Sequence, residues 1–261
     1  RKVKEILVEG LKRLEYRGYD SAGLALINCK TLELSCIKTV GKVQALEDRL
    51  KDDSSDGAIG IAHTRWATHG KPTQENAHPH LSNDRIALIH NGIIENFMPL
   101  KEALINDGYT FKTETDTEVI VHLTHRYLTK ENLKLFDAVT KTISQLEGAY
   151  GLAVIDKEDP KRIIVARSGS PLTIGVGIGE NFIASDPAAL GQVTDRFIYL
   201  EEGDIAEIEA RKYKIYNNGE KVEREIIRLN QNLEDTVKGR YRHFMLKEIF
   251  EQPDVVRNTL A

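Results

Sequence analysis

The chain has 261 residues, of which 41% are hydrophobic and 29% charged, and this composition is typical of a globular protein with a sizeable core. Its 36 basic and 40 acidic residues give a formal net charge of -4, which excludes the strongly basic surface of a nucleic-acid-binding or membrane-binding protein. No apolar run is long enough to span a bilayer and no signal-peptide pattern opens the sequence. We therefore expect a cytoplasmic protein with no nucleic-acid or membrane partner.

Apolar spacing predicts helices alternating with strands in the first half of the chain. Residues 3–14 carry apolar side chains at helical spacing, with lysine and arginine on the opposite face. The pair Asn91 and Gly92 follows a predicted strand and by itself predicts a hairpin turn, because both residue types tolerate positive φ. In chain order we expect a helix that begins at Arg1 and runs through Leu14, strands at 24–27 and 32–40, a helix at 41–50, strands at 59–62 and 86–89, a helix at 99–107, a strand at 109–113, and helical segments within 117–146.

The second half is predicted to consist mainly of strands. Apolar alternating segments separated by turn residues continue through most of 150–227. A polar stretch without periodicity at 230–240 is typical of an interdomain linker. The other expected elements are a short helix near 187–190, a hairpin turn at 217–219, a helix at 241–251, an interruption at Pro253, and a further helix from 254.

One stretch concentrates the kinds of side chain that bind ligands. From Gly60 to Gly70 the sequence reads GIAHTRWATHG, in which a short apolar strand leads into hydrogen-bonding and aromatic residues. Gly70 and the nearby Pro72 end the stretch, so we expect a ligand-facing loop after a strand. The alternative is structural, with Trp66 in the core and Arg65 in a surface ion pair.

The two cysteines, Cys29 and Cys36, have no metal-ligand spacing. Cys36 shares a strand face with Leu32 and Leu34, so we expect it to be a small buried hydrophobic residue. A catalytic thiol normally needs an electropositive and partly exposed setting. Neither cysteine has one in the sequence, so we assign neither as a nucleophile.

Several histidines lie in or near the central stretch, and imidazoles are frequent metal ligands. No His-x-x-x-His helix and no acidic partner at ligand spacing accompanies them. We therefore expect no metal site and no cofactor, and we expect His69 to shape the loop. These histidines are His63, His69, His78, His80 and His90.

Six motifs, taken together and in order, resemble the glutamine amidotransferase domain of the glucosamine-6-phosphate synthases, which are isomerising glutamine:fructose-6-phosphate aminotransferases. The resemblance covers nearly the whole chain, and MLKEIFEQP at 245–253 resembles the passage into the sugar-phosphate isomerase domain of these enzymes. The six motifs are LEYRGYDSAG (14–23), GIAHTRWATHG (60–70), NAHPH (76–80), HNGIIEN (90–96), ETDTEV (114–119) and RSGSPL (167–172).

The resemblance places the chain among the N-terminal nucleophile hydrolases and implies an α+β fold. That fold is a four-layer αββα sandwich of two mostly antiparallel sheets between helical layers. The implied organisation is an amidotransferase domain at 1–230, a linker at 231–240, and the start of the isomerase domain at 241–261. The nucleophile of the family is an N-terminal cysteine on the first strand, and we expect that strand to precede Arg1 in the parent protein.

Hydrolysis of a primary amide at a thiol needs donors aimed at the oxyanion and partners for the two charged ends of the amino acid. By resemblance, Asn91 supplies its side-chain amide and Gly92 its backbone N–H to the oxyanion hole. Arg65 and Thr68 are assigned to the α-carboxylate of glutamine, and Asp116 to its α-ammonium. The alternative for Asp116 is to cap the helix that begins beside it.

Three further residues are assigned to the glutamine site by resemblance. Trp66 matches a residue on the loop that gates the passage of ammonia toward the second domain, and His69 lies on the same loop. Arg17, in YRGYD, matches an arginine near the nucleophile. The alternative for Arg17 is to cap carbonyl groups at a helix end.

The resulting hypothesis is the glutaminase half of a glucosamine-6-phosphate synthase, which releases ammonia from L-glutamine for fructose 6-phosphate on the isomerase domain. We expect a homo-oligomer formed through that second domain. One alternative is a non-catalytic glutamine-binding or assembly module, in a fragment that lacks its nucleophile. Another is a relative in the same hydrolase group, such as an amidophosphoribosyltransferase or an asparagine synthetase, although RWATHG and KEIFEQP favour the first hypothesis.

Overall fold

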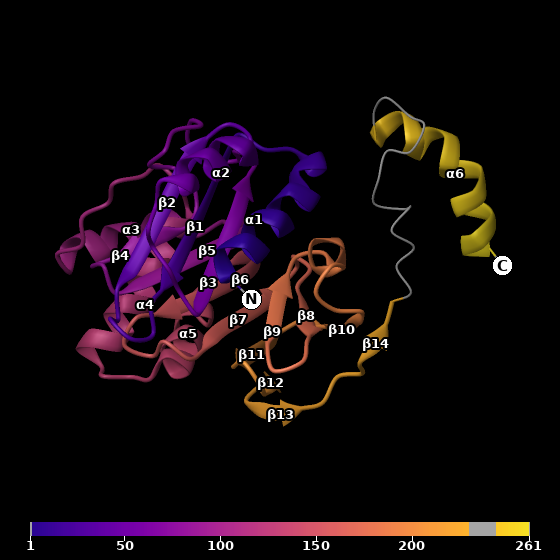
Figure 1. Ribbon diagram of the computed structural model, residues 1–261. Coiled ribbons are helices and arrows are strands. Elements are labelled where there is room, and N and C mark those ends of the chain that lie inside the picture. Colours follow the sequence, from indigo (N-terminus) through magenta and orange to yellow (C-terminus); the bar gives the residue numbers. More distant parts are fainter. Residues whose placement is uncertain (1, 230–243, 261) are drawn as a thin grey trace. The chain divides into compact units, whose positions relative to one another are not determined.

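The structure, a computed structural model, describes residues 2–229 and 244–260 (Figure 1). The chain divides into two compact units, Arg1–Arg228 and Leu229–Ala261. The described strands all belong to the first unit. The predicted linker at 231–240 lies outside the described residues, and the predicted domain boundaries stay predictions.

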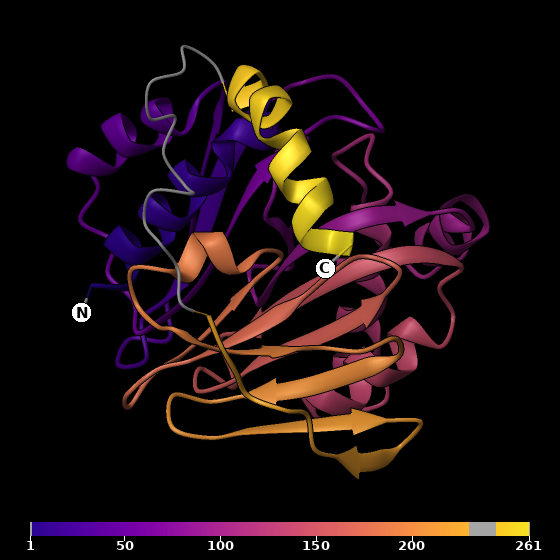
Figure 2. The same ribbon diagram turned by 90° about the vertical axis from the view of Figure 1, so that its right-hand side faces the viewer.

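One layer of the first unit is an antiparallel sheet of seven strands in the order β13-β12-β11-β7-β6-β5-β4. Figure 2 shows strands of this sheet side by side, in colours from magenta to orange. Its central strands are apolar and buried because both faces of the sheet are covered. The strands are β4 (His80–Ser82), β5 (Ile86–Ile94), β6 (Gly148–Asp156), β7 (Ile163–Ser168), β11 (Asp204–Ile208), β12 (Tyr213–Asn217) and β13 (Glu220–Val222).

The other β layer consists of two smaller antiparallel sheets. Three strands pair in the order β2-β1-β3, and four pair in the order β14-β10-β8-β9, so β3 and β9 are edge strands. The three-stranded sheet contains β1 (Ser21–Ile27), β2 (Leu34–Val40) and β3 (Ile59–Arg65). The four-stranded sheet contains β8 (Thr173–Val176), β9 (Asn181–Ala184), β10 (Arg196–Tyr199) and β14 (Ile227–Arg228).

Helices cover the outer faces of both β layers. α1 and α2 pack on the three-stranded sheet, and α4 and α5 pack on the seven-stranded sheet, with α3 against α4. The helices are α1 (Val3–Leu14), α2 (Val43–Lys51), α3 (Phe97–Asn106), α4 (Thr117–Lys130) and α5 (Leu135–Ile143), with the short 3-10 helices η1 (Glu15–Arg17) and η2 (Pro187–Leu190).

Strand β1 shows how the layers are ordered. Leu24 and Leu26 pack into the core beneath α1 and α2, whereas Ala25 and Ile27 face the core between the two β layers. Successive side chains of a strand point to opposite faces, so a strand buried on both sides reads as a continuous apolar run. The predicted α+β fold with four αββα layers is confirmed, with the difference that two smaller sheets share one layer.

The predicted strand at 109–113 is wrong, because the chain has no regular secondary structure there. The backbone N–H groups of Lys112 and Thr113 donate to the Glu118 carboxylate at 2.9 and 2.8 Å. A side chain therefore satisfies amides that would otherwise need a neighbouring strand. This contact also ties the segment to the first turn of α4.

The second unit contains the described helix α6 (Phe244–Leu260). Pro253 lies inside this helix, so the predicted interruption is wrong. Proline removes one donor of the helical ladder, and here the turns on both sides of it are still formed. In the part of the chain that the structure describes, no helix is both long and apolar enough to cross a membrane.

The predicted hairpin turn at Asn91 and Gly92 is also wrong. Both residues lie within β5, opposite Gly151 and Tyr150 of β6. Gly92 has a φ of 133°, and a Cβ on it would lie 2.0 Å from the carbonyl oxygen of Ala149. The tolerance of glycine for positive φ is used here for a close approach between strands.

We expect Gly92→Ala to lower the free energy of unfolding by about 2 kcal/mol or more, because the methyl group meets backbone and the φ is unfavourable. Gly151→Ala is the matched control in the same strand pair, since its Cβ would have its nearest neighbours at 3.5 Å and beyond. The control should lose less than about 1 kcal/mol. Urea unfolding followed by circular dichroism measures both losses, and equal losses would contradict this account.

Candidate functional site

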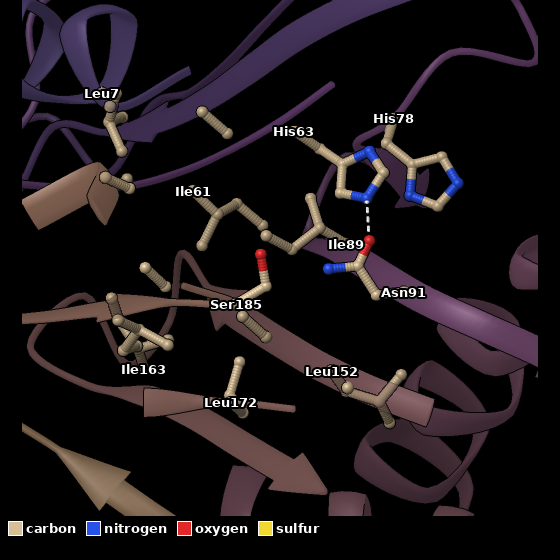
Figure 3. Close-up of a pocket in the computed structure, with 18 of the residues that line it drawn as sticks. Leu7, Ile61, His63, His78, Ile89, Asn91, Leu152, Ile163, Leu172 and Ser185 are labelled. Atoms are coloured by element: carbon tan, nitrogen blue, oxygen red, sulfur yellow. Dashed lines mark hydrogen bonds between the residues drawn. The ribbon is translucent and has the colours of Figure 1, made fainter. Parts of the chain in front are cut away.

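The residues that the sequence singled out come together on one cavity of about 850 Å³ in the first unit. They reach it from β3 and the loop after it, from β5, from the start of α4, and from η1. Apolar side chains such as Ile61, Ile89 and Leu152 form much of the remaining wall (Figure 3). The predicted residues on the wall are Arg17, Arg65, Trp66, Thr68, His69, Asn91, Gly92 and Asp116.

The two β layers are joined at this cavity by a polar contact. His63 of β3 and Asn91 of β5 form a 2.8 Å hydrogen bond between Nε2 and Oδ1 (Figure 3). Arg65 lies two residues after His63 on the same strand, so the two side chains leave the same face of β3. The register of β3 therefore places an imidazole against Asn91 and a guanidinium beside it.

Arg65 is buried, with 4% of its surface exposed, so the surface ion pair considered as an alternative is wrong. Its guanidinium donates to the carbonyl oxygens of His69, Gly70 and Lys71. The Oδ1 atom of Asp20 lies 3.6 Å from Nη1 and supplies the opposite charge. A buried guanidinium needs such partners, and these partners give the loop after β3 its shape.

Asp20 is a positioning residue that sequence reasoning missed. Its carboxylate accepts hydrogen bonds from the backbone N–H of Ala67 and from the hydroxyl of Ser21, the latter at 2.7 Å. Its own backbone N–H donates to the carbonyl oxygen of Arg65 at 2.7 Å. Asp20 thus fixes the beginning of the loop 66–71. The sequence feature that could have indicated Asp20 is its position in the polar turn just before β1.

Trp66 is on the surface with 69% of its area exposed, so the core alternative is wrong. Its ring packs on Gly18, where a Cβ would come within 2.0 Å of the ring. Thr68 is exposed, whereas His69 is half-buried and places its ring 5.6 Å from that of Phe97. The loop therefore exposes an aromatic and a hydroxyl side chain at the mouth of the cavity.

Asp116 is 4% exposed and immediately precedes α4. Its Oδ2 atom accepts a hydrogen bond from the backbone N–H of Ile94 at 2.8 Å and lies 4.0 Å from Nδ1 of His90. Asp116 occupies the N-cap position of α4, but its side chain makes no capping hydrogen bond, so the capping alternative is wrong. The carboxylate instead ties the start of α4 to the end of β5.

Arg17 ends η1 and forms an ion pair with Asp186, which precedes η2. Its Nε atom donates to the hydroxyl oxygen of Tyr16 at 3.0 Å. These contacts with side chains account for Arg17 without the helix-end capping considered from the sequence. Arg17 joins two segments of the cavity wall that are far apart in the chain.

His63 belongs to a cluster of four histidines with His78, His80 and His90. The rings of His63 and His78 stack at 4.4 Å, and those of His78 and His80 meet edge to face at 4.6 Å. Burial lowers the pKa of His63 to about 4 and also lowers the pKa values of His78, His80 and His90, so all are uncharged at neutral pH. Within the described residues, no three His, Cys, Asp or Glu side chains are arranged to hold a metal ion.

Cys29 is on the cavity wall, but it lies away from the end of the cavity that holds Arg65, and Cys36 is not on the wall. Cys29 follows β1 and lies past the Ile27–Ile59 end of the β1–β3 ladder, whereas Arg65 lies at the opposite end. The two ends are six residues apart, or roughly 20 Å at the usual rise of a strand. Burial raises the pKa of Cys36 to about 11, which disfavours its reactive thiolate form.

Comparison with known proteins identifies the family. The sequence model of a protein family, the glutamine amidotransferase domain, matches residues 63–192. The glutamine–fructose-6-phosphate aminotransferases (isomerizing) of Idiomarina loihiensis and Pseudomonas putida are each 57% identical to this chain over 261 residues. This chain contains a domain of the glutamine amidotransferase family. The whole chain aligns with 42% of each of these two relatives, so it spans less than half of their length.

The fold agrees with this membership. Glutamine phosphoribosylpyrophosphate amidotransferase from Bacillus subtilis, solved in complex with ADP and GMP, matches with a TM-score of 0.70 and 29% identity. The match covers 83% of this chain and 47% of that one. The predicted resemblance to the N-terminal nucleophile amidotransferases is therefore confirmed. The roles of the individual site residues stay predictions.

His63 is the second residue that sequence reasoning missed. It is one of five histidines without metal-ligand spacing, and the sequence pattern gives it no role. Its partner Asn91 lies 28 positions later in the chain and in the other β layer. Spacing along one element cannot reveal such a contact, because it depends on how the two layers pack.

We expect the free energy of unfolding to fall as the pH is lowered from about 6.5 toward 4, because the unfolded chain protonates histidines that are neutral when folded. For His63 alone the slope in this window is at most about 1.4 kcal/mol per pH unit. Urea titrations at pH 7.5, 6.5, 5.5 and 4.5 measure it. His63→Gln, which cannot titrate, should show a shallower slope, and a variant as steep as the wild type would contradict the assignment to His63.

Proposed function

We propose that this chain is the glutaminase part of a larger glucosamine-6-phosphate synthase. In this proposal it hydrolyses L-glutamine, and the ammonia reacts with fructose 6-phosphate on a second domain. The observation that carries the proposal is the convergence of Arg65, Asn91 and Asp116 on one cavity. A guanidinium and a carboxylate suit the two charged ends of an amino acid, and a carboxamide suits the oxyanion that forms from its amide.

The proposed roles follow from where each group lies. Arg65 and Thr68 bind the α-carboxylate of glutamine, and Asp116 accepts hydrogen bonds from the α-ammonium. Asn91 and Gly92 donate to the oxygen of the scissile amide, which becomes negatively charged when a thiolate attacks the carbonyl carbon. When water is excluded from the cavity, the local dielectric constant falls, and these charged contacts become stronger.

The loop after β3 is proposed to control access to the reaction. Trp66 and His69 line the mouth of the cavity and are assigned to closing it around glutamine and guiding ammonia out. Arg17 is assigned to the wall near the nucleophile, where its pairing with Asp186 holds two wall segments together. The 69% exposure of Trp66 supports the proposal, because an exposed aromatic ring gains burial when the loop closes.

The cavity also suggests a place for the thiol. Its wall includes residues of β3 and of β9, each an edge strand whose outer backbone groups can pair with a further strand. We assign this place to the thiol-bearing strand that the resemblance puts before Arg1. The apolar wall suits the side chains of such a strand, and it includes Ile61, Ile89, Leu152, Ile163 and Leu172 (Figure 3).

The helix of the second unit supports the proposal that a further domain belongs to the full-length protein. The helix α6 exposes Met245, Ile249 and Val256, with 72%, 53% and 55% of their surfaces exposed. Their spacing puts them on one helical face, and an apolar face of this kind suits burial against further protein. The greater length of the relatives agrees with this interpretation.

Glutamate release from glutamine by the full-length protein tests the proposal. We expect release that stops when the N-terminal cysteine is replaced by alanine, while glutamine binding remains in a calorimetric titration. Release that survives this substitution would exclude the thiol mechanism. A wild-type protein that binds glutamine and releases no glutamate would favour the non-catalytic binding module instead.

Arg65→Ala should raise the KM for glutamine by roughly 10- to 100-fold, which corresponds to the loss of a charge-assisted pair of about 1.5 to 3 kcal/mol. Arg85→Ala is the matched control, because Arg85 pairs with Asp156 and is not on the cavity wall. Steady-state kinetics of glutamate release measures both variants. An unchanged KM in Arg65→Ala would contradict the proposed carboxylate contact.

A further inference from the structure

The carboxamide of Asn91 has one side held and one side open. Its Oδ1 atom is 2.8 Å from Nε2 of His63, and the described residues give its Nδ2 atom no hydrogen-bond partner. Figure 3 shows Nδ2 on the side away from His63, toward the space lined by Ile89 and Leu152. An oxyanion donor needs this arrangement, with the N–H groups facing the substrate and the oxygen turned away.

We propose that His63 is a positioning residue that keeps Asn91 in this orientation. The proposal rests on the proposed function, because it assumes that Asn91 donates to the oxyanion. An Asn oxygen can only accept hydrogen bonds, so Nε2 of His63 carries the proton and donates. This donation holds Oδ1 at His63 and leaves both N–H groups of Nδ2 for the substrate. If the carboxamide rotated by 180°, its oxygen atom would face the oxyanion. Both atoms accept hydrogen bonds, so the oxyanion would then have no donor from Asn91.

The surroundings of His63 hold this one tautomer. With Nε2 protonated, Nδ1 carries no proton, and Nδ1 is buried without a hydrogen-bond partner among the described residues. The opposite tautomer would leave a buried N–H group without an acceptor, which is rarely tolerated. Protonation of both nitrogens is opposed by burial, which lowers the pKa of His63 to about 4. The ring itself is fixed by stacking on His78 at 4.4 Å.

Packing alone does not account for an imidazole at this position. One of its two nitrogens is buried and unpaired, and an apolar side chain of similar size would avoid that cost. The hydrogen bond to Asn91 is the polar contact that His63 makes in the described structure. That contact joins the two β layers, so it also fixes Asn91 relative to Arg65 on the same face of β3.

Three substitutions at position 63 of the full-length protein test the proposal by steady-state kinetics of glutamine hydrolysis. His63→Leu removes the donor, His63→Gln places an amide N–H near the former Nε2, and His63→Asn places one near the former Nδ1. We expect His63→Leu and His63→Asn to lower kcat by roughly 10- to 100-fold with less than about a threefold change in KM. His63→Gln should recover most of the wild-type kcat.

Asn91→Ala and the double variant His63→Leu with Asn91→Ala complete a mutant cycle. Asn91→Ala should lower kcat by roughly 100- to 1000-fold, the usual effect of losing one oxyanion donor. Because His63 acts through Asn91, the double variant should be no slower than Asn91→Ala. His80→Leu is the control for a lost buried histidine, since His80 bonds Thr115 and lies outside the cavity wall, and it should change stability more than kcat.

The outcomes separate the two proposals. If Asn91→Ala retains the wild-type kcat, the oxyanion assignment and with it the proposed function of the site fails. If Asn91→Ala is slow while His63→Leu and His63→Asn are as fast as the wild type, only the positioning role of His63 fails. Multiplicative losses in the double variant, or equal rescue by glutamine and asparagine, also overturn that role. Should His63→Leu not fold, the comparison of His63→Gln with His63→Asn still decides.

Discussion

The face-to-face packing of the two β layers is the constraint on which the site depends. Ala25 and Ile61 of one layer share a core with Ala153 and Ile155 of the other, and such cores hold sheets about 10 Å apart. At the end of this core the apolar side chains give way to polar ones, and the same spacing lets His63 reach across to the opposite layer. The apolar contact therefore sets the distances that the polar groups need.

The buried charged groups on the cavity wall, Arg65 and Asp116, have partners within the fold. Arg65 is surrounded by carbonyl oxygens of its own loop and lies near Asp20, and Asp116 accepts a backbone N–H. The buried histidines are neutral because burial lowers their pKa values. An isolated buried charge costs several kcal/mol, so these contacts keep the site formed without a ligand. In the proposed function, glutamine therefore competes with these internal partners at Arg65 and Asp116.

Periodicity in the sequence was enough to predict most helices and strands, because buried faces impose their own spacing. It failed where a contact outside the element's own apolar pattern determined the local structure. Glu118 satisfies the amides that suggested a strand at 109–113, and Ala149 crowds the glycine that suggested a turn at Gly92. The family and the main site residues came from motifs. The contacts of Asp20 and His63 could not be predicted, since each joins segments that only the packed layers bring together.

Arg65 links the proposed recognition of glutamine to the shape of the loop. A guanidinium has five N–H donors, and three of its hydrogen bonds go to carbonyl oxygens of the loop residues 69–71. A bound carboxylate must therefore share the guanidinium with these carbonyls or displace them. Displacement changes the conformation of the segment that carries Trp66, the exposed ring packed on Gly18. In the proposed function, displacement would couple glutamine binding to the loop conformation, by as much as the affinity of glutamine for the two loop conformations differs.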